Sequence, residues 1–225
     1  MARDVRLLIL AMTAGSADGW SYVGLGHAFV ANMTGNTVLM GVAVFQNHSA
    51  LLHPAIALGS YAAGVLIGSL LTGDVSADEG WSKTISWTLM VEAFLLLSAE
   101  AGWVATQLHA SHSPNLILLL VALAVAIGIQ SSVMVQLQIP GIVTTYITGT
   151  WTTMLSGFVN LAKHRRPPAQ KLEFEHRLMM QAAVLSAYFL SAVLTGWLFR
   201  HLPIAVGAVP ALCLFLVAVH GILFG

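Results

Sequence analysis

The chain consists of long apolar stretches separated by short segments that hold most of its charges. Each long stretch approaches the ~20 residues that an α-helix needs to cross ~30 Å of hydrocarbon. They cover residues 5–26, 53–72, 84–106, 115–137, 178–199 and 204–224. Charged residues make up only 8% of the chain, whereas soluble domains carry roughly 25%. The sequence therefore predicts an all-α integral membrane protein in contact with a lipid bilayer.

Two further apolar pieces, 34–46 and 145–162, are shorter and follow segments rich in Gly, Thr and Asn. If both pieces cross the membrane, the chain has eight transmembrane segments. If both re-enter the membrane and return, it has six. We keep both models, and both require helices because lipid offers no partners to unpaired backbone groups.

Lysine and arginine residues gather in two places. The loop 163–177 holds five of the nine, and the amino end holds two more. Because Lys and Arg in short loops stay on the cytoplasmic side, we expect this loop and both termini to be cytoplasmic. The formal net charge is zero, which leaves no electrostatic surface for nucleic acid. The chain also lacks a nucleotide-binding or nucleophile motif and metal-ligand spacing, so no cofactor and no metal are expected.

The two halves of the chain share a layout. In the first half, residues 14–18 lead through a Gly-rich break to the Thr-Gly pair at 34–35, and in the second half residues 128–132 lead to the pair at 148–149. Thr148 lies 114 residues after Thr34, about half the chain. We therefore expect a single membrane domain, 1–225, made of two pseudo-symmetric repeats, 1–112 and 113–225. Each repeat is expected to contain a broken or half-length helix.

The breaks point to function. In each half an extended segment, 28–33 or 142–147, is expected to precede a short helix, for which Thr34, Asn36, Thr148 and Thr150 are natural caps. A helix that begins inside the membrane presents unpaired N–H groups and the positive end of its dipole. Paired helix starts of this kind build midplane substrate sites in several transporters. The alternative is that Gly and Thr here only allow close helix packing.

Ionisable and polar residues inside the apolar stretches complete the predicted site. Asp18 and Glu92 are candidates for proton coupling, because charges at membrane depth are expensive and usually functional. The alternatives are interfacial solvation for Asp18 and a hydrogen-bonded structural carboxyl for Glu92. The predicted substrate-binding residues are Asp18, Asn32, Thr34, Gly35, Asn36, Gln130, Ser131, Thr145, Tyr146, Thr148, Gly149 and Thr150.

Small residues also recur at helical spacing. Ser60, Gly64 and Gly68 stand four residues apart, which is the pattern of close helix contact. A related pattern, Tyr188, Ser191 and Thr195, lies 127 residues after Tyr61, Gly64 and Gly68. We interpret these positions as packing contacts within the fold or at the interface of a homo-oligomer.

Two motifs carry a resemblance to a known family. The run 28–37, preceded by Asp18 and Gly19, and the run from Gln130 to Thr150 resemble the YoaK-like family of bacterial membrane proteins along essentially the full chain. That resemblance implies a bacterial inner-membrane protein and transfers no catalytic residues. The architecture alone, an extended segment with a half-helix in each repeat, is similar to that of nucleobase, sulfate and bicarbonate transporters, in a chain of about half their length.

The sequence thus favours a secondary transporter or facilitator, and not an enzyme, for a small polar or anionic solute. The solute would bind between the two breaks. One alternative is a membrane-embedded enzyme that uses Asp18, His27 and Glu92, which requires those side chains to converge. Another is an accessory or structural membrane protein whose breaks are packing devices.

Overall fold

The computed structural model is all-α in the parts of the chain that it describes. These are residues 3–46, 48–73, 81–108, 116–139, 144–145, 147–163 and 168–224. Within these ranges there are eight α-helices, two short 3₁₀ helices and no β-strand. The helices are α1 (Arg3–Gly24), α2 (Met33–Gln46), η1 (His48–Leu51), α3 (Leu52–Thr72), α4 (Lys83–Leu108), α5 (Leu116–Leu137), α6 (Ile147–Lys163), α7 (Pro168–His201), η3 (Pro203–Ala205) and α8 (Ala208–Phe224).

Five of the described helical segments are long and apolar enough to cross a membrane: η1 with α3, then α4, α5, α7 and α8. Each coincides with an apolar stretch expected from the sequence. The sixth expected stretch is helix α1, which has 22 residues but carries Arg3, Asp4, Arg6 and Asp18. Twelve of its residues are buried among the other helices. A helix that faces protein does not need the apolar surface of one that faces lipid.

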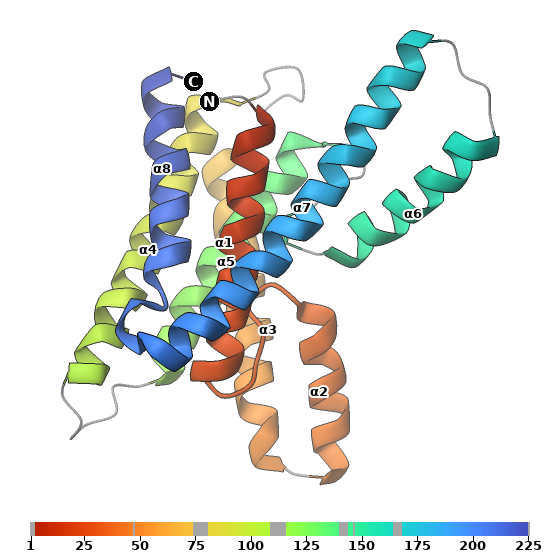
Figure 1. The fold of residues 1–225 in the computed structure, drawn as a ribbon. Helices are drawn as coiled ribbons and strands as arrows, with labels where there is room; N and C mark the ends of the chain where they lie inside the picture. Colours follow the sequence, from red (N-terminus) through yellow and green to blue (C-terminus); the bar gives the residue numbers. More distant parts are fainter. Residues whose placement is uncertain are drawn as a thin grey trace.

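Two crossings of long helices form the centre of the molecule. Helix α1 packs on α7, and α3 packs on α5. Helix α4 contacts both α5 and α8, and α8 contacts α1 in turn. The two ends of the chain lie at the same end of this bundle (Figure 1).

Both crossings depend on a glycine at the point of closest approach. A Cβ at Gly15 of α1 would collide with the carbonyl oxygen of Tyr188 on α7. A Cβ at Gly128 of α5 would collide with the carbonyl oxygen of Tyr61 on α3 and lie 2.9 Å from the Cα of Gly64. The predicted close helix contact along Gly64 is thereby confirmed. Backbones can approach this closely only where no side chain stands between them.

The two short helices flank the bundle. Helix α2 has 14 residues and packs on α3, and α6 has 17 residues and packs on α7. Both expected short pieces, 34–46 and 145–162, are thus helical nearly over their predicted lengths. Figure 1 shows that α2 and α6 begin near the middle of the bundle's height and run in opposite directions.

The residues before each short helix are not helical where the structure describes them. Residues 25–32 form turns, bends and irregular backbone between α1 and α2, with positive φ at Gly26 (97°) and His27 (58°). Thr144 and Thr145 are non-helical before α6. The predicted Pro-Gly break at 140–141 lies outside the described residues.

The predicted helix caps need a correction. Helix α2 begins at Met33 and α6 at Ile147, so Thr34, Asn36, Thr148 and Thr150 lie in the first turns rather than at the caps. At α2 the cap is Asn32, whose Oδ1 accepts a hydrogen bond from the Gly35 N–H at 3.0 Å. Asparagine is among the best capping residues because its short side chain reaches the free donors of the first turn.

Candidate functional site

One carboxylate holds the segment that joins α1 to α2. Asp18 is only 5% exposed. Its Oδ1 accepts hydrogen bonds from the backbone N–H groups of Val30 at 2.7 Å and Ala31 at 2.6 Å. Its Oδ2 accepts a hydrogen bond from the hydroxyl of Tyr188 on α7. The carboxylate therefore supplies partners to backbone donors that no helix satisfies, and it joins this segment to α7.

A buried amide holds the same segment from the other side. The Oδ1 of Asn36 accepts a hydrogen bond from the Phe29 N–H at 2.9 Å, and its Nδ2 donates to the Phe29 carbonyl oxygen at 2.6 Å. An asparagine side chain can pair in both directions in this way because it carries one acceptor and two donors. Asn36 is fully buried and fixes the segment before α2 against the first turn of that helix.

In the second half of the chain, the side chain of Gln130 connects Thr144, which precedes α6, to helix α1. Its Nε2 donates to the Leu10 carbonyl oxygen of α1 at 3.0 Å and to the Thr144 Oγ1 at 3.4 Å. The neighbouring Ser131 donates to the Ile127 carbonyl oxygen within its own helix. Both side chains are buried, as predicted, and Gln130 positions the residue that immediately precedes Thr145.

A cavity of about 580 Å³ lies where the two segments meet the short helices. It brings the first turn of α2 and the first turn of α6 to one space, together with one tyrosine from α3 and one from α7. Its described lining residues are Ala31, Asn32, Met33, Thr34, Tyr61, Thr145, Ile147, Thr148, Gly149, Trp151 and Tyr188. Among these there is no Lys, Arg, Asp or Glu. Hydroxyls, one amide, helix-start N–H groups and aromatic rings therefore set its chemistry.

One polar group among the residues that line this cavity has no hydrogen-bond partner in the described part of the chain. Thr145 is 1% exposed, and its Oγ1 makes no hydrogen bond with any described residue. A buried hydroxyl without a partner destabilises the folded protein by about 1–3 kcal/mol. Thr145 lines the cavity with other atoms, because its Oγ1 is itself closed off from open space.

The predicted site residues divide into those that line the cavity and those that support it. Asn32, Thr34, Thr145, Thr148 and Gly149 line it. Tyr146 lies outside the described residues. The supporting group, which hydrogen-bonds to lining residues or their neighbours or is buried close to them in the chain, comprises Asp18, Gly35, Asn36, Gln130 and Thr150. Ser131 is buried and donates within α5 to the Ile127 carbonyl oxygen, and no described hydrogen bond joins it to a lining residue.

The site analysis from sequence missed the two tyrosines. Tyr61 and Tyr188 both line the cavity, yet their spacing led us to treat their neighbourhood as packing only. The signal was available, because each tyrosine lies three residues before the small residue at a helix crossing, Gly64 or Ser191. At such a crossing the side chain beside the contact is directed along the seam between helices.

Comparison with known proteins places the chain in a family. The model of the family described as "Protein of unknown function (DUF1275)" matches residues 6–220. The chain belongs to the DUF1275 family. A relative, the UPF0700 transmembrane protein YoaK of Bacillus subtilis (strain 168), is 29% identical over 195 residues, which cover 86% of this chain and 83% of the relative. No solved structure matches.

These matches confirm the resemblance drawn from the motifs around Thr34 and Thr148. They also agree with the helices described above: this DUF1275 chain is a multi-pass membrane protein.

Two further carboxyls of the DUF1275 chain lie on α4 in different surroundings. Glu92 is fully buried, and neither of its oxygens has a hydrogen-bond partner among the described residues. Glu100, two turns later, accepts a hydrogen bond at Oε2 from the Gly207 N–H at 2.9 Å. His27 contacts the ring of Tyr22 at a centroid distance of 5.2 Å. No described hydrogen bond or ion pair joins Asp18, His27 and Glu92 to one another, and no group of metal-ligating side chains occurs in the described residues.

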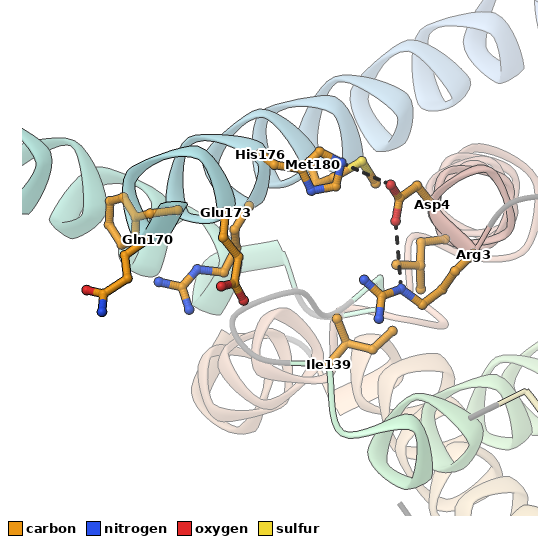
Figure 2. A pocket seen from close by; sticks show the side chains of 10 residues that line it. Arg3, Asp4, Ile139, Gln170, Glu173, His176 and Met180 are labelled. Atoms are coloured by element: carbon orange, nitrogen blue, oxygen red, sulfur yellow. Dashed lines mark ion pairs between the residues drawn. The ribbon is translucent and has the colours of Figure 1, made fainter. Parts of the chain in front are cut away.

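A second hollow, of about 390 Å³, lies at the end of the bundle that carries the termini. Figure 2 shows Arg3 and Asp4 of α1 facing Glu173 and His176 of α7 across it. His176 Nε2 lies 3.2 Å from Asp4 Oδ2, and Arg3 Nε lies 3.7 Å from Asp4 Oδ1. These side chains are about one-third to two-thirds exposed, and ion pairs of this kind contribute little to stability. The hollow contains none of the predicted site residues.

Proposed function

We propose that this protein is a secondary transporter or facilitator that binds a small polar or anionic solute between the starts of two half-length helices. The observation that carries the proposal is the cavity that Thr34 and Thr148 share. Each is the second residue of a short helix, so the positive dipole ends of both helices lie at one space.

The proposal includes two repeats, 1–112 and 113–225. The pattern of helix contacts supports this division: α1 packs on α7 as α5 packs on α3, and α2 packs on α3 as α6 packs on α7. The two crossings also match in detail. Gly15 meets the Tyr188 carbonyl and Gly128 meets the Tyr61 carbonyl, and the two tyrosines stand 127 residues apart, as the sequence pattern predicts.

The proposal places α2 and α6 as half-helices that begin at membrane depth. Their lengths of 14 and 17 residues are short of the ~20 residues that span the hydrocarbon. Their starts near the middle of the bundle and their opposite directions (Figure 1) support this placement. Irregular backbone at that depth is tolerated only where protein or a wet cavity surrounds it. Here the side chains of Asn36 and Asp18 accept hydrogen bonds from the backbone N–H groups of Phe29, Val30 and Ala31.

We place the protein in the bacterial inner membrane with both termini and the loop 163–177 in the cytoplasm. The concentration of Lys and Arg in that loop and at the amino end supports this orientation. Glu92 is the better candidate for proton coupling, because its carboxyl has no hydrogen-bond partner among the described residues, whereas the Asp18 carboxylate accepts hydrogen bonds from three donors.

The test begins with a thermal-shift screen of the purified protein against inorganic anions, organic acids and nucleobases. Any solute that stabilises the protein is then followed into liposomes. Thr34→Val and Thr148→Val should each slow its flux about two- to tenfold, because each removes a hydrogen bond of about 0.5–1.5 kcal/mol. Thr37→Val is the matched control, since Thr37 lies one turn further along α2, is exposed and bonds only within its helix. Wild-type flux in both cavity variants would show that the site is assigned wrongly.

A further inference from the structure

Helix α6 has two different exposed sides. Thr148, Thr152, Ser156 and Asn160 recur every four residues and form a polar stripe along one side. The adjoining exposed side carries Trp151, Leu155 and Phe158, which are 49–54% exposed. An amphipathic helix of this kind normally lies between an apolar and an aqueous environment.

The stripe is not covered by α7. Helix α6 contacts α7 through Met154 and Gly157, where the side chains of Phe174 and Leu178 pack. The residues of the stripe, Thr148, Thr152, Ser156 and Asn160, are all exposed. Amide and hydroxyl groups are costly to place against hydrocarbon, so the stripe requires either water or another protein surface.

Hollows along the stripe follow one another from the cavity outward. The cavity ends on Thr148 and Gly149. One turn later a groove of about 320 Å³ begins, lined by Thr152, Thr153, Ser156, Gly157, Asn160, Phe174, Arg177, Leu178 and Gln181. Phe174 and Arg177 also line the charged hollow of Figure 2. The groove and this hollow therefore adjoin, and hollowed surface extends along α6 and α7 from Thr152 to the end of the bundle that carries the termini.

Helix α2 offers no such surface at the matched positions. In the register that aligns Thr34 with Thr148, the counterparts of Thr152, Thr153 and Ser156 are Val38, Leu39 and Val42. These three side chains are 37–60% exposed. The same positions on the two short helices thus carry hydroxyls on α6 and aliphatic groups on α2.

We propose that the stripe on α6 lines a water-filled route between the cavity and the membrane face that carries the loop 163–177. This route extends the proposed function and takes its orientation in the membrane from that proposal. The solute reaches and leaves the cavity along α6 on the cytoplasmic side. The corresponding surface of α2 faces lipid.

The route can be tested by cysteine accessibility in the full chain. The background is Cys213→Ser, which removes the single native cysteine. Thr152→Cys and Ser156→Cys place thiols on the stripe, Val38→Cys and Val42→Cys place them at the matched positions of α2, and Leu155→Cys places one on the apolar side of α6. The probe is the membrane-impermeant reagent sulfonatoethyl methanethiosulfonate, applied to inverted and to right-side-out membrane vesicles. Gel filtration of each variant in detergent shows whether it folds.

We expect the two stripe thiols to react in inverted vesicles about tenfold or more faster than the other three, because the reactive thiolate forms in water and is disfavoured in apolar surroundings. Reaction no faster than that of Leu155→Cys overturns the route. So does spontaneous disulfide-linked dimerisation of Ser156→Cys in place of labelling, which would mean that a second copy covers the stripe. Reaction from right-side-out vesicles alone overturns the orientation.

The outcome also separates this inference from the proposed function, because labelling needs no solute. A solute that binds and is transported without labelling of the stripe removes the route and leaves the cavity site. Labelling of the stripe in a protein that no tested solute stabilises leaves a water-filled crevice and counts against transport.

Discussion

The Asp18 carboxylate and the Glu92 carboxyl show how differently two buried acids are used in one membrane protein. Asp18 accepts two backbone N–H groups and the Tyr188 hydroxyl, which occupies most of the roughly four acceptor sites of a carboxylate. Glu92 is equally buried and accepts none from the described residues. The first is a positioning residue for the cavity wall, through Ala31 and Tyr188, both of which line the cavity.

Substitutions at Asp18 should reveal this positioning role as a loss of stability. Asp18→Ala leaves the N–H groups of Val30 and Ala31 without their acceptor, which costs about 1–3 kcal/mol each. Tyr188→Phe removes one donor and leaves both N–H groups paired, so its cost should be about 1–2 kcal/mol. Thermal unfolding in detergent should therefore rank wild type above Tyr188→Phe and Tyr188→Phe above Asp18→Ala. The exposed Tyr22 provides the control: Tyr22→Phe should unfold like the wild type, and an unchanged Asp18→Ala would contradict the role.

The two glutamates of α4 should respond in opposite ways to the same change. Glu92→Gln removes a carboxyl that has no hydrogen-bond partner among the residues that the structure describes, so the melting temperature should stay the same or rise. Glu100→Gln replaces the carboxylate that accepts the hydrogen bond from the Gly207 N–H by a neutral amide oxygen. The bond becomes weaker, and stability should fall by about 1 kcal/mol. If Glu92→Gln destabilises the protein more than Glu100→Gln does, Glu92 has a structural partner and is no longer the better candidate for proton coupling.

At the scale of elements, the fold depends on two helix crossings that tolerate no side chain at their centre. Gly15 and Gly128 are packed against the backbone of the partner helix, whereas Gly59 on α3 and Gly196 on α7 face open space with nothing within 4 Å. Both kinds of glycine carry the same intrinsic helix penalty of about 1 kcal/mol relative to alanine. Only the close approach explains why a glycine is needed at the crossings.

Alanine substitution separates the two kinds of glycine. Gly15→Ala and Gly128→Ala should each lower stability by about 1–3 kcal/mol through overpacking, because the obstructing atoms are backbone and cannot rotate away. Gly59→Ala and Gly196→Ala should leave stability unchanged or raise it by up to about 1 kcal/mol. Thermal unfolding of the four variants in one detergent measures the difference. Equal effects at all four positions would mean that the crossings are looser than the distances indicate.

At the scale of the whole molecule, the helices could be predicted from the sequence, but the contacts between them could not. The length of an apolar stretch is a local property of the sequence, and it located the long helices to within a few residues. The exception is the amino-terminal part of α7, because this helix begins at Pro168 rather than at residue 178. That extension carries charges outside the apolar stretch and forms one wall of the hollow in Figure 2. The cap at Asn32 was misplaced because Thr34 and Asn36 are equally good capping residues by type.

The site was partly predictable for the same reason. The Thr-Gly helix starts at 34 and 148 are sequence motifs, and both line the cavity. The roles of Asp18 and Asn36 were not predictable, because each depends on which backbone groups the chain brings within reach. Tyr61 and Tyr188 were missed because a tyrosine beside a glycine pattern looks like packing until the crossing helix is known.

The crossings also predict how the molecule assembles. Helix α1 packs on α7 and α5 on α3, so each half of the chain supplies one member of both central pairs. Neither half alone can then bury the glycine-containing helix surfaces that meet at the two crossings. Cutting the chain between Leu108 and Leu116 should give two fragments that aggregate or are degraded when expressed singly and that copurify as a folded complex when expressed together. The complex should melt below the intact chain, because joining the fragments costs translational and rotational entropy. A first fragment that is monodisperse and protease-resistant without the second would show that each half folds around its own core and that the interlocked arrangement of helices is wrong.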